Sequence, residues 1–193
     1  MSNSSLATIF FTFAIVQNFI VVQFLGLCPF FGVTKKLHDS LYMGLALVAV
    51  MVGSAIICWA ITYKLLIPFD MLYMSNVIYI LVIATFVQIV EMFIKRTNAN
   101  LYNAFGIYLP LITVNCAVLG ITLINLRENF SLLQSIVASL GGGCGFILVM
   151  IIMAAIRERL DLADTPKSMR GLPVAIFVAM LLGMTFMGFR GIG

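Results

Sequence analysis

Two cysteines in matching sequence contexts are the residues of this chain with the clearest chemical potential. Cys28 and Cys116 each lie in an apolar stretch, and Gly32 and Gly120 follow them at the same offset. Two thiolates in an apolar environment are very costly unless a metal holds them. Because sulfur is a soft ligand, the pair indicates an iron–sulfur or a zinc centre.

An iron–sulfur centre at these positions would require a second protein chain. A [2Fe–2S] cluster normally takes four cysteine ligands, and only Cys28 and Cys116 stand in matching motifs. A partner would therefore supply the other two. Cys58 and Cys144 have no counterpart in the other half of the chain, and we interpret them as small packing residues. Cys144 follows the run Gly141–Gly143, which indicates close packing between helices.

The composition indicates which solvent surrounds the elements that carry these cysteines. Of the 193 residues, 63% are hydrophobic and 9% are charged, whereas a soluble domain has about 25% charged residues. Lipid is therefore the natural solvent for most of the chain, which we expect to form one membrane domain over residues 1–193. The sequence contains no hydrolase or phosphate-binding motif and no basic patch interleaved with aromatics, which argues against a soluble enzyme or a nucleic-acid-binding protein.

Six apolar stretches are long enough, or nearly long enough, to cross a bilayer, which takes about 20 residues. Backbone polar groups in lipid must be paired internally, so the predicted fold is all-α, with six transmembrane helices. The stretches are Leu6–Thr34, Leu41–Thr62, Met71–Ile94, Leu101–Leu126, Leu132–Ile156 and Leu172–Phe189.

The basic residues between these stretches predict the orientation of the chain. The first, third and fifth connectors hold Lys35, Lys36, Lys95, Arg96, Arg157, Arg159, Lys167 and Arg170. The opposite side holds Lys64, Arg127 and Arg190. Because cytoplasmic loops are enriched in Lys and Arg, both termini are predicted to face away from the cytoplasm.

The first and fourth stretches are longer than one span requires, and each contains residues that disfavour a continuous helix. Pro29 opposes helix continuation in the first, and Pro110 interrupts the fourth. Three spans separate the two cysteine motifs, so the two stretches enter the membrane from opposite sides. This is typical of an inverted three-plus-three repeat, with halves at about 1–98 and 99–193, whose broken helices meet near the bilayer midplane.

Two charged groups near the ends of these stretches have plainer interpretations. Glu91 precedes Lys95 by one helical turn, and we favour an ion pair there over a carboxylate on an ion path. The cluster at Arg157–Arg159 closes the fifth stretch and is interpreted as a cytoplasmic anchor rather than a functional site.

Four segments of the chain closely resemble the A subunit of the Rnf complex, and the resemblance covers essentially the whole length. They are residues 24–36 (FLGLCPFFGVTKK), 109–120 (LPLITVNCAVLG), 155–160 (AIRERL) and 186–189 (FMGF). The related E subunit of the Na⁺-pumping NADH:quinone reductase is also similar, although Pro29 and the pair Val118–Leu119 look more like the Rnf version.

The resemblance implies a component of an ion-translocating ferredoxin:NAD⁺ oxidoreductase in the bacterial cytoplasmic (inner) membrane. In that family, the A and E subunits are homologous six-helix proteins that hold one [2Fe–2S] cluster between them. Cys28 and Cys116 would be this chain's ligands to the cluster iron. The further partners would be the B, C, D and G subunits, the membrane lipid, and the translocated Na⁺ or H⁺. Other subunits would handle flavins, NAD and ferredoxin, so this chain alone is not expected to be catalytic.

Three alternatives remain open at this stage. The chain could be the equivalent subunit of the Na⁺-pumping NADH:quinone reductase. It could instead be a metal-free secondary transporter with an inverted repeat, or a structural subunit that anchors redox partners. The last two predict that replacing Cys28 and Cys116 with alanine is tolerated.

Overall fold

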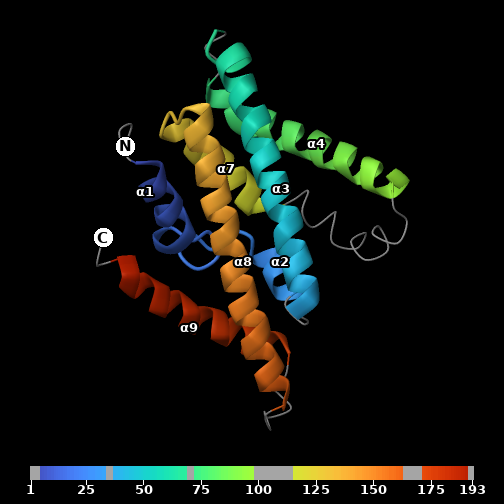
Figure 1. Ribbon diagram of the computed structural model, residues 1–193, viewed down its shortest axis with the longest axis vertical. Coiled ribbons are helices and arrows are strands. Elements are labelled where there is room, and N and C mark those ends of the chain that lie inside the picture. The colour runs from blue at the N-terminus through green and yellow to red at the C-terminus, as the bar shows by residue number, and fades with distance from the viewer. Residues whose placement is uncertain (1–4, 34–36, 69–71, 98–114, 163–170, 191–193) are drawn as a thin grey trace.

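The computed structural model describes residues 5–33, 37–68, 72–97, 115–162 and 171–190, and every regular element in this part of the chain is helical. The all-α prediction is therefore confirmed for these residues (Figure 1). The longer helices are α3 (Leu37–Ile61), α4 (Ser75–Thr97), α7 (Cys116–Arg127), α8 (Leu132–Leu162) and α9 (Leu172–Arg190). The shorter elements are α1 (Leu6–Phe11), α2 (Leu27–Val33), the π-helical turns η1 (Thr12–Val16) and η2 (Thr62–Leu66), and the 3₁₀ turn η3 (Leu72–Met74).

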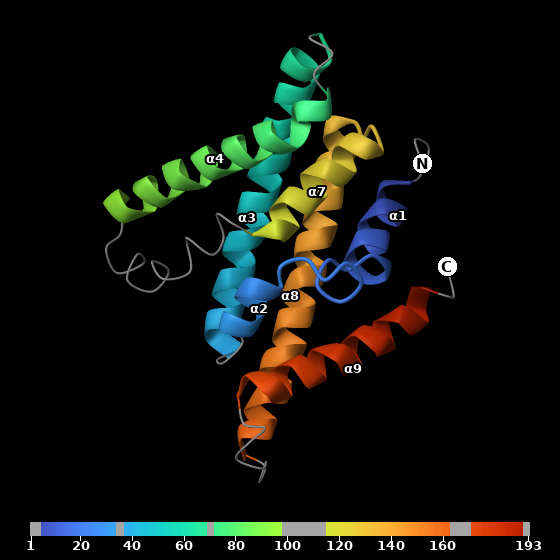
Figure 2. The ribbon, with the colours of Figure 1, turned by 180° about the vertical axis from the view of Figure 1, so that it is seen from behind.

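The antiparallel pair α3 and α8 forms the centre of the molecule (Figures 1 and 2). Glycines allow the two helices to approach closely. A Cβ atom added to Gly143 would lie 2.6 Å from Val48 Cγ2, and one added to Gly44 would lie 2.6 Å from Ile147 Cγ1. The predicted close packing around the glycine run of α8 is therefore confirmed, as expected where small residues let helix backbones meet.

A different face of α8 receives the N-terminal segment. A Cβ atom at Gly141 would lie 2.7 Å from the carbonyl oxygen of Phe10, and one at Gly142 would lie 2.5 Å from the ring of Phe19. Asn18, which is fully buried, donates from Nδ2 to the carbonyl oxygen of Gly145 at 2.8 Å. The glycines of α8 therefore form a surface against which α1, η1 and the irregular segment after η1 pack.

The first apolar stretch is interrupted between η1 and α2. Residues 17–26 leave the helical path, and the backbone has positive φ at Phe24 (55°) and at Gly26 (83°). Asn18 stabilises the turn, because its Oδ1 accepts from the N–H of Ile20 at 3.1 Å. Pro29 lies inside α2, in its first turn, where a missing N–H removes no intrahelical bond. The proline therefore belongs to the helix start, and the break precedes the cysteine.

Several described helices are apolar enough for a bilayer. The segments Ser40–Leu66, Ser75–Met92 and Leu132–Leu160 are long enough to cross one, and Leu6–Val16, Cys116–Arg127 and Leu172–Gly188 are shorter apolar helices. The predicted end of the fifth stretch at Ile156 differs from the structure, because α8 continues to Leu162. A helix satisfies its own backbone, so polar residues end the apolar span without ending the helix. The start of the fourth stretch, with Pro110, lies outside the described residues.

Candidate cysteine site between two helix starts

The two motif cysteines lie at the starts of two helices. Cys28 is the second residue of α2, and Cys116 is the first residue of α7. The two helices begin beside the middle of the α3–α8 pair and run toward its opposite ends (Figure 2). Because the first four N–H groups of a helix lack intrahelical partners, a helix start favours negative charge. Both thiols are therefore placed where the backbone can support an anionic ligand.

One hydrogen bond joins the two motifs directly. The backbone N–H of Gly26 donates to Sγ of Cys116 at 2.9 Å, although the two residues are 90 positions apart. Gly26 precedes Cys28 by two residues, a distance of at most about 7 Å along the chain. The Cα atom of Cys28 therefore lies within roughly 12 Å of Cys116 Sγ. The prediction that the interrupted first stretch brings the two motifs together is confirmed.

Small residues make this approach possible. A Cβ atom at Gly26 would lie 2.6 Å from Cε2 of Phe146 and 3.3 Å from Oδ1 of Asn115. A Cβ atom at Gly120, the motif glycine after Cys116, would lie 2.7 Å from Cδ1 of Leu25. Residues four apart share one face of a helix, so Cys116 and Gly120 lie on the same face of α7. The glycine leaves room on this face for the side chain of Leu25.

Asn115 fixes the start of α7. It is the N-cap residue, and its Oδ1 accepts from the N–H of Ala117 at 3.0 Å. Such a cap stabilises a helix by about 1 kcal/mol. The Nδ2 atom of Asn115 is buried and has no hydrogen-bond partner in the described structure. The capping asparagine therefore sets the position of Cys116 and keeps one donor unused beside it.

The far end of α2 is held by a residue that we interpreted as a cytoplasmic anchor. Arg157, on α8, donates from its guanidinium to the carbonyl oxygen of Phe31 at 3.0 Å. The carbonyls at a helix C-terminus lack intrahelical donors, and a cation there also favours the helix dipole. Arg157 therefore ties α2 to α8. No pattern in the sequence points to this contact, because 126 positions separate the two residues.

The four cysteines differ in their exposure. Cys28 is exposed, Cys116 is partly buried, Cys58 is buried and Cys144 is exposed. The packing interpretation suits Cys58, whereas Cys144 faces outward from α8. Among the residues that the structure describes, no group of three or more His, Cys, Asp or Glu side chains could hold a metal ion. The assignment of Cys28 and Cys116 as ligands of a shared metal centre therefore stays a prediction.

The predicted ion pair of Glu91 is not tested by the structure. Glu91 lies on α4 and is partly buried, while the side chain of Lys95 lies outside the described residues. The pairing therefore stays a prediction.

The fold and the site together define a class of protein: an all-helical membrane protein in which an interrupted helix brings two cysteine motifs together. The family described as "Rnf-Nqr subunit, membrane protein" matches residues 6–193. The chain belongs to this family.

Curated relatives agree with this assignment. The chain is 44% identical to the A subunit of the proton-translocating ferredoxin:NAD⁺ oxidoreductase complex of Clostridium ljungdahlii, over 97% of each chain. It is 46% identical to the A subunit of the ion-translocating oxidoreductase complex of Pectobacterium atrosepticum, over 96% of each chain. It is 48% identical to the protein of the same name from Citrobacter koseri, over 92% of each chain. The predicted resemblance to the Rnf A subunit is confirmed.

Proposed function

We propose that this chain is the A subunit of an Rnf-type complex and carries electrons across the membrane through a [2Fe–2S] cluster shared with a homologous partner. The hydrogen bond from Gly26 to Cys116 carries the proposal, because it brings two cysteine motifs from distant parts of the chain together. In this proposal the complex couples ferredoxin:NAD⁺ oxidoreduction to the movement of Na⁺ or H⁺. The relatives' names, which describe components of ion-translocating oxidoreductases, support it.

The proposed topology has six spans in an inverted repeat, in a bacterial inner membrane, with both termini on the non-cytoplasmic side. Two hydrogen bonds support an alternating arrangement of connectors. Trp59 donates to the carbonyl oxygen of Phe130, so the C-terminal part of α3 and the turn after α7 lie at one end. Arg157 bonds to the end of α2 at the other end, near the start of α3. In this proposal the second end faces the cytoplasm, because cytoplasmic connectors are enriched in basic residues.

The residues of the site suit the two-thiol share of such a cluster. Cys28 is exposed on this chain, which leaves it accessible to the partner that would provide the other ligands. The N–H of Gly26 would remain bonded to the Cys116 sulfur, and such bonds tune the potential of a cluster. Phe30 and Phe146, both almost fully buried, would exclude water from the inner side of the site.

The position of the site explains how a cluster held there would help electrons cross the membrane. A bilayer core is about 30 Å thick, which is too far for one efficient electron hop. When bound, the cluster would accept and donate single electrons at an intermediate depth. The chain's own residues would hold it near the middle of the α3–α8 pair and keep it dry.

Electron paramagnetic resonance on the reduced complex tests the proposal. We expect Cys28→Ala and Cys116→Ala each to abolish one [2Fe–2S] signal while the complex stays assembled. Cys144→Ala is the matched control, because Cys144 is also a free cysteine in an apolar helix but lies outside the site. If every iron signal survives both site variants, the cysteines are packing residues, and the metal-free transporter or scaffold interpretation replaces this one.

A further inference from the structure

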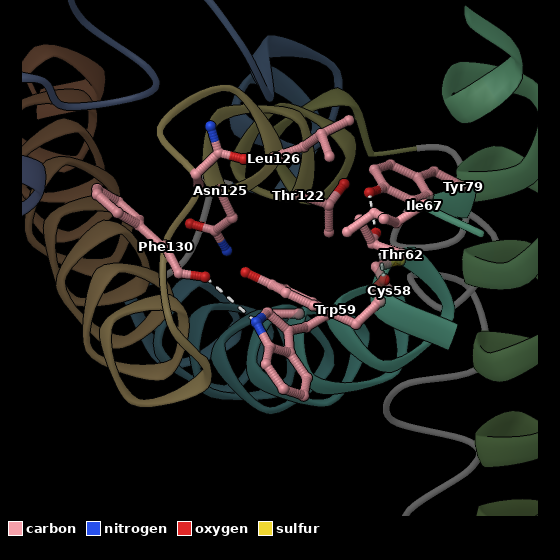
Figure 3. A pocket seen from close by; sticks show the side chains of 12 residues that line it. Cys58, Trp59, Thr62, Ile67, Tyr79, Thr122, Asn125, Leu126 and Phe130 are labelled. Atoms are coloured by element: carbon pink, nitrogen blue, oxygen red, sulfur yellow. Dashed lines mark hydrogen bonds between the residues drawn. The ribbon is translucent and has the colours of Figure 1, made fainter. Parts of the chain in front are cut away.

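A cavity of about 80 Å³ lies between the C-terminal turns of α3 and α7, away from the cysteine site. Figure 3 shows its lining side chains, which come from α3 with η2, from α7 and its following turn, and from α4. Its buried polar lining consists of Thr62, Tyr79, Thr122 and Asn125. A cavity needs about 10–15 Å³ of such space to hold one water molecule, so this one has room for a water molecule or a small ion.

Asn125 is the residue that indicates a ligand. Its side chain is 8% exposed and points into the cavity (Figure 3). Neither its Oδ1 nor its Nδ2 has a hydrogen-bond partner in the described structure. A buried amide without partners is costly, and native proteins normally satisfy such a group with another side chain, a water or a bound ligand. Asn125 therefore presents an unused amide group to the cavity, and its carbonyl oxygen is free to accept from or to coordinate a ligand.

The hydroxyl groups of Thr62 and Tyr79 in the cavity already donate their hydrogens in hydrogen bonds. Thr62 donates its hydroxyl hydrogen to the carbonyl oxygen of Cys58 at 2.7 Å. In the hydrogen bond between Thr62 and Tyr79, the tyrosine must consequently be the donor. The Tyr79 oxygen then has lone pairs but no hydrogen to offer. Trp59 likewise directs its N–H to the carbonyl oxygen of Phe130. These assignments leave Tyr79 and Asn125 as oxygen acceptors toward a ligand.

The helices around the cavity favour a positive charge. Thr62 begins the π-turn that ends the α3 segment, and Asn125 lies in the last turn of α7. The C-terminal end of a helix carries a partial negative charge, and here two such ends meet. Half-helix C-termini and neutral oxygens are used in this way to coordinate small cations in membrane proteins.

We propose that this cavity binds a monovalent cation of the size of Na⁺, with Asn125 Oδ1 and Tyr79 Oη among its ligands. No Asp or Glu is among the described residues that line it. Neutral oxygens alone compensate poorly for the desolvation of a divalent ion, so a single charge fits better. Lys64 and Arg127 are exposed at this end of the molecule and do not line the cavity.

A second hollow beside the cavity provides an acidic approach. It has a volume of about 40 Å³ and is lined by Glu128, Thr12 and Gln17, among others. Phe130, which is almost fully buried, lines both hollows. The exposed carboxylate of Glu128 would raise the local concentration of cations at this entrance. The assignment of this end to the non-cytoplasmic side rests on the proposed function, whereas cation binding itself does not.

The chain contains one tryptophan, Trp59, and it lines this cavity. Its fluorescence can therefore report occupancy without a label. The experiment uses the full chain purified in lipid nanodiscs and titrated with NaCl, with choline chloride at equal ionic strength as the reference. We expect a saturable change in Trp59 emission with Na⁺ and no such change with choline.

Two variants assign the response to the cavity. Asn125→Leu removes both amide atoms at similar volume, and Tyr79→Phe removes only the hydroxyl. Each is expected to weaken Na⁺ binding at least about tenfold, because one ligand is lost. Asn76→Leu, the same substitution at an exposed position of α4, is the control and should keep the wild-type response. Circular dichroism and gel filtration identify any variant that does not fold.

The outcomes separate this proposal from the proposed function. If the emission follows ionic strength alone, or if both variants retain the Na⁺ response, the cavity is not a cation site. If the wild type shows neither a fluorescence response nor broadening of the sodium NMR line, the cavity holds water and the proposal is overturned. Because the chain alone cannot hold the shared cluster, the Na⁺ titration tests the cation site independently of the electron paramagnetic resonance of the complex, and the two failures are distinguishable.

Discussion

Gly26 is the position where a single methyl group should disturb the cysteine site most directly. Its φ is 83°, and an added Cβ atom would lie 2.6 Å from Cε2 of Phe146. An L-residue with a side chain pays roughly 1–2 kcal/mol in the left-handed region. Overpacking against a buried ring adds roughly 1–3 kcal/mol. Gly26→Ala should therefore lower the free energy of unfolding by about 2–5 kcal/mol.

Thermal unfolding of the purified full chain measures this effect, and electron paramagnetic resonance of the assembled complex measures its consequence at the site. The strain should displace the N–H of Gly26 from its 2.9 Å contact with Cys116 Sγ. A weaker bond to the sulfur should lower the reduction potential of a cluster held there, because hydrogen bonds to sulfur stabilise the reduced state.

Gly188→Ala is the control for the general cost of replacing a glycine. Gly188 lies on α9, and no atom lies within 4 Å of a Cβ atom added there. Inside a helix, alanine is about 1 kcal/mol more favourable than glycine, so this variant should be neutral or slightly stabilised. If Gly26→Ala unfolds at the same temperature as the wild type, the positive φ and the contact with Phe146 do not constrain this position, and the reasoning is refuted.

Three further predictions follow from single contacts. Asn18→Ala should lower the thermal unfolding temperature, because it removes the bond to the Gly145 carbonyl and leaves the buried Ile20 N–H without a partner, which costs about 1–3 kcal/mol. Gln88→Ala, at an exposed position, should not lower it, and equal stability of the two variants would contradict this. Asn115→Ala should destabilise the chain by about 0.5–2 kcal/mol and shift the cluster signal, because the cap of α7 is lost. Asn115→Ser should keep the wild-type stability and cluster signal, because serine also caps helices. A serine variant as impaired as the alanine variant would argue against the cap. Reduction of the cluster should tighten Na⁺ binding about sevenfold. Asn125 lies about 14 Å along α7 from Cys116, and one added negative charge at that distance contributes about 1.2 kcal/mol at an effective dielectric of about 20. Identical Na⁺ affinities in the oxidised and the reduced complex would show that the cluster and the cation do not interact electrostatically.

The sequence was sufficient to predict the all-helical class and the meeting of the two cysteine motifs. The first followed from composition, and the second from the repeated cysteine–glycine spacing combined with an interrupted first stretch. The exact place of the interruption was harder to predict. Pro29 is visible in a sequence, but whether a proline ends a helix or begins one depends on the backbone before it, here the turn around Gly26.

The contacts that support the site could not be predicted, because they join residues that are far apart in the chain. Arg157 looks like any basic residue at the end of an apolar span, and its bond to Phe31 depends on how α2 packs against α8. Asn125 is one of several uncharged polar residues in apolar stretches. Its importance arises only from its burial without a partner beside a cavity.

The glycine surface of α8 has a consequence for the synthesis and folding of the chain. The N-terminal segment docks on Gly141, Gly142 and Gly145, and the bond from Asn18 to Gly145 spans 127 positions. At about 5–20 residues per second, the ribosome needs roughly 6–25 s to synthesise that interval. During this time the first segment must wait at the insertion machinery, or in lipid, with the polar side chain of Asn18 unprotected. The N-terminal segment can therefore complete its folding only after the fifth apolar stretch has been synthesised.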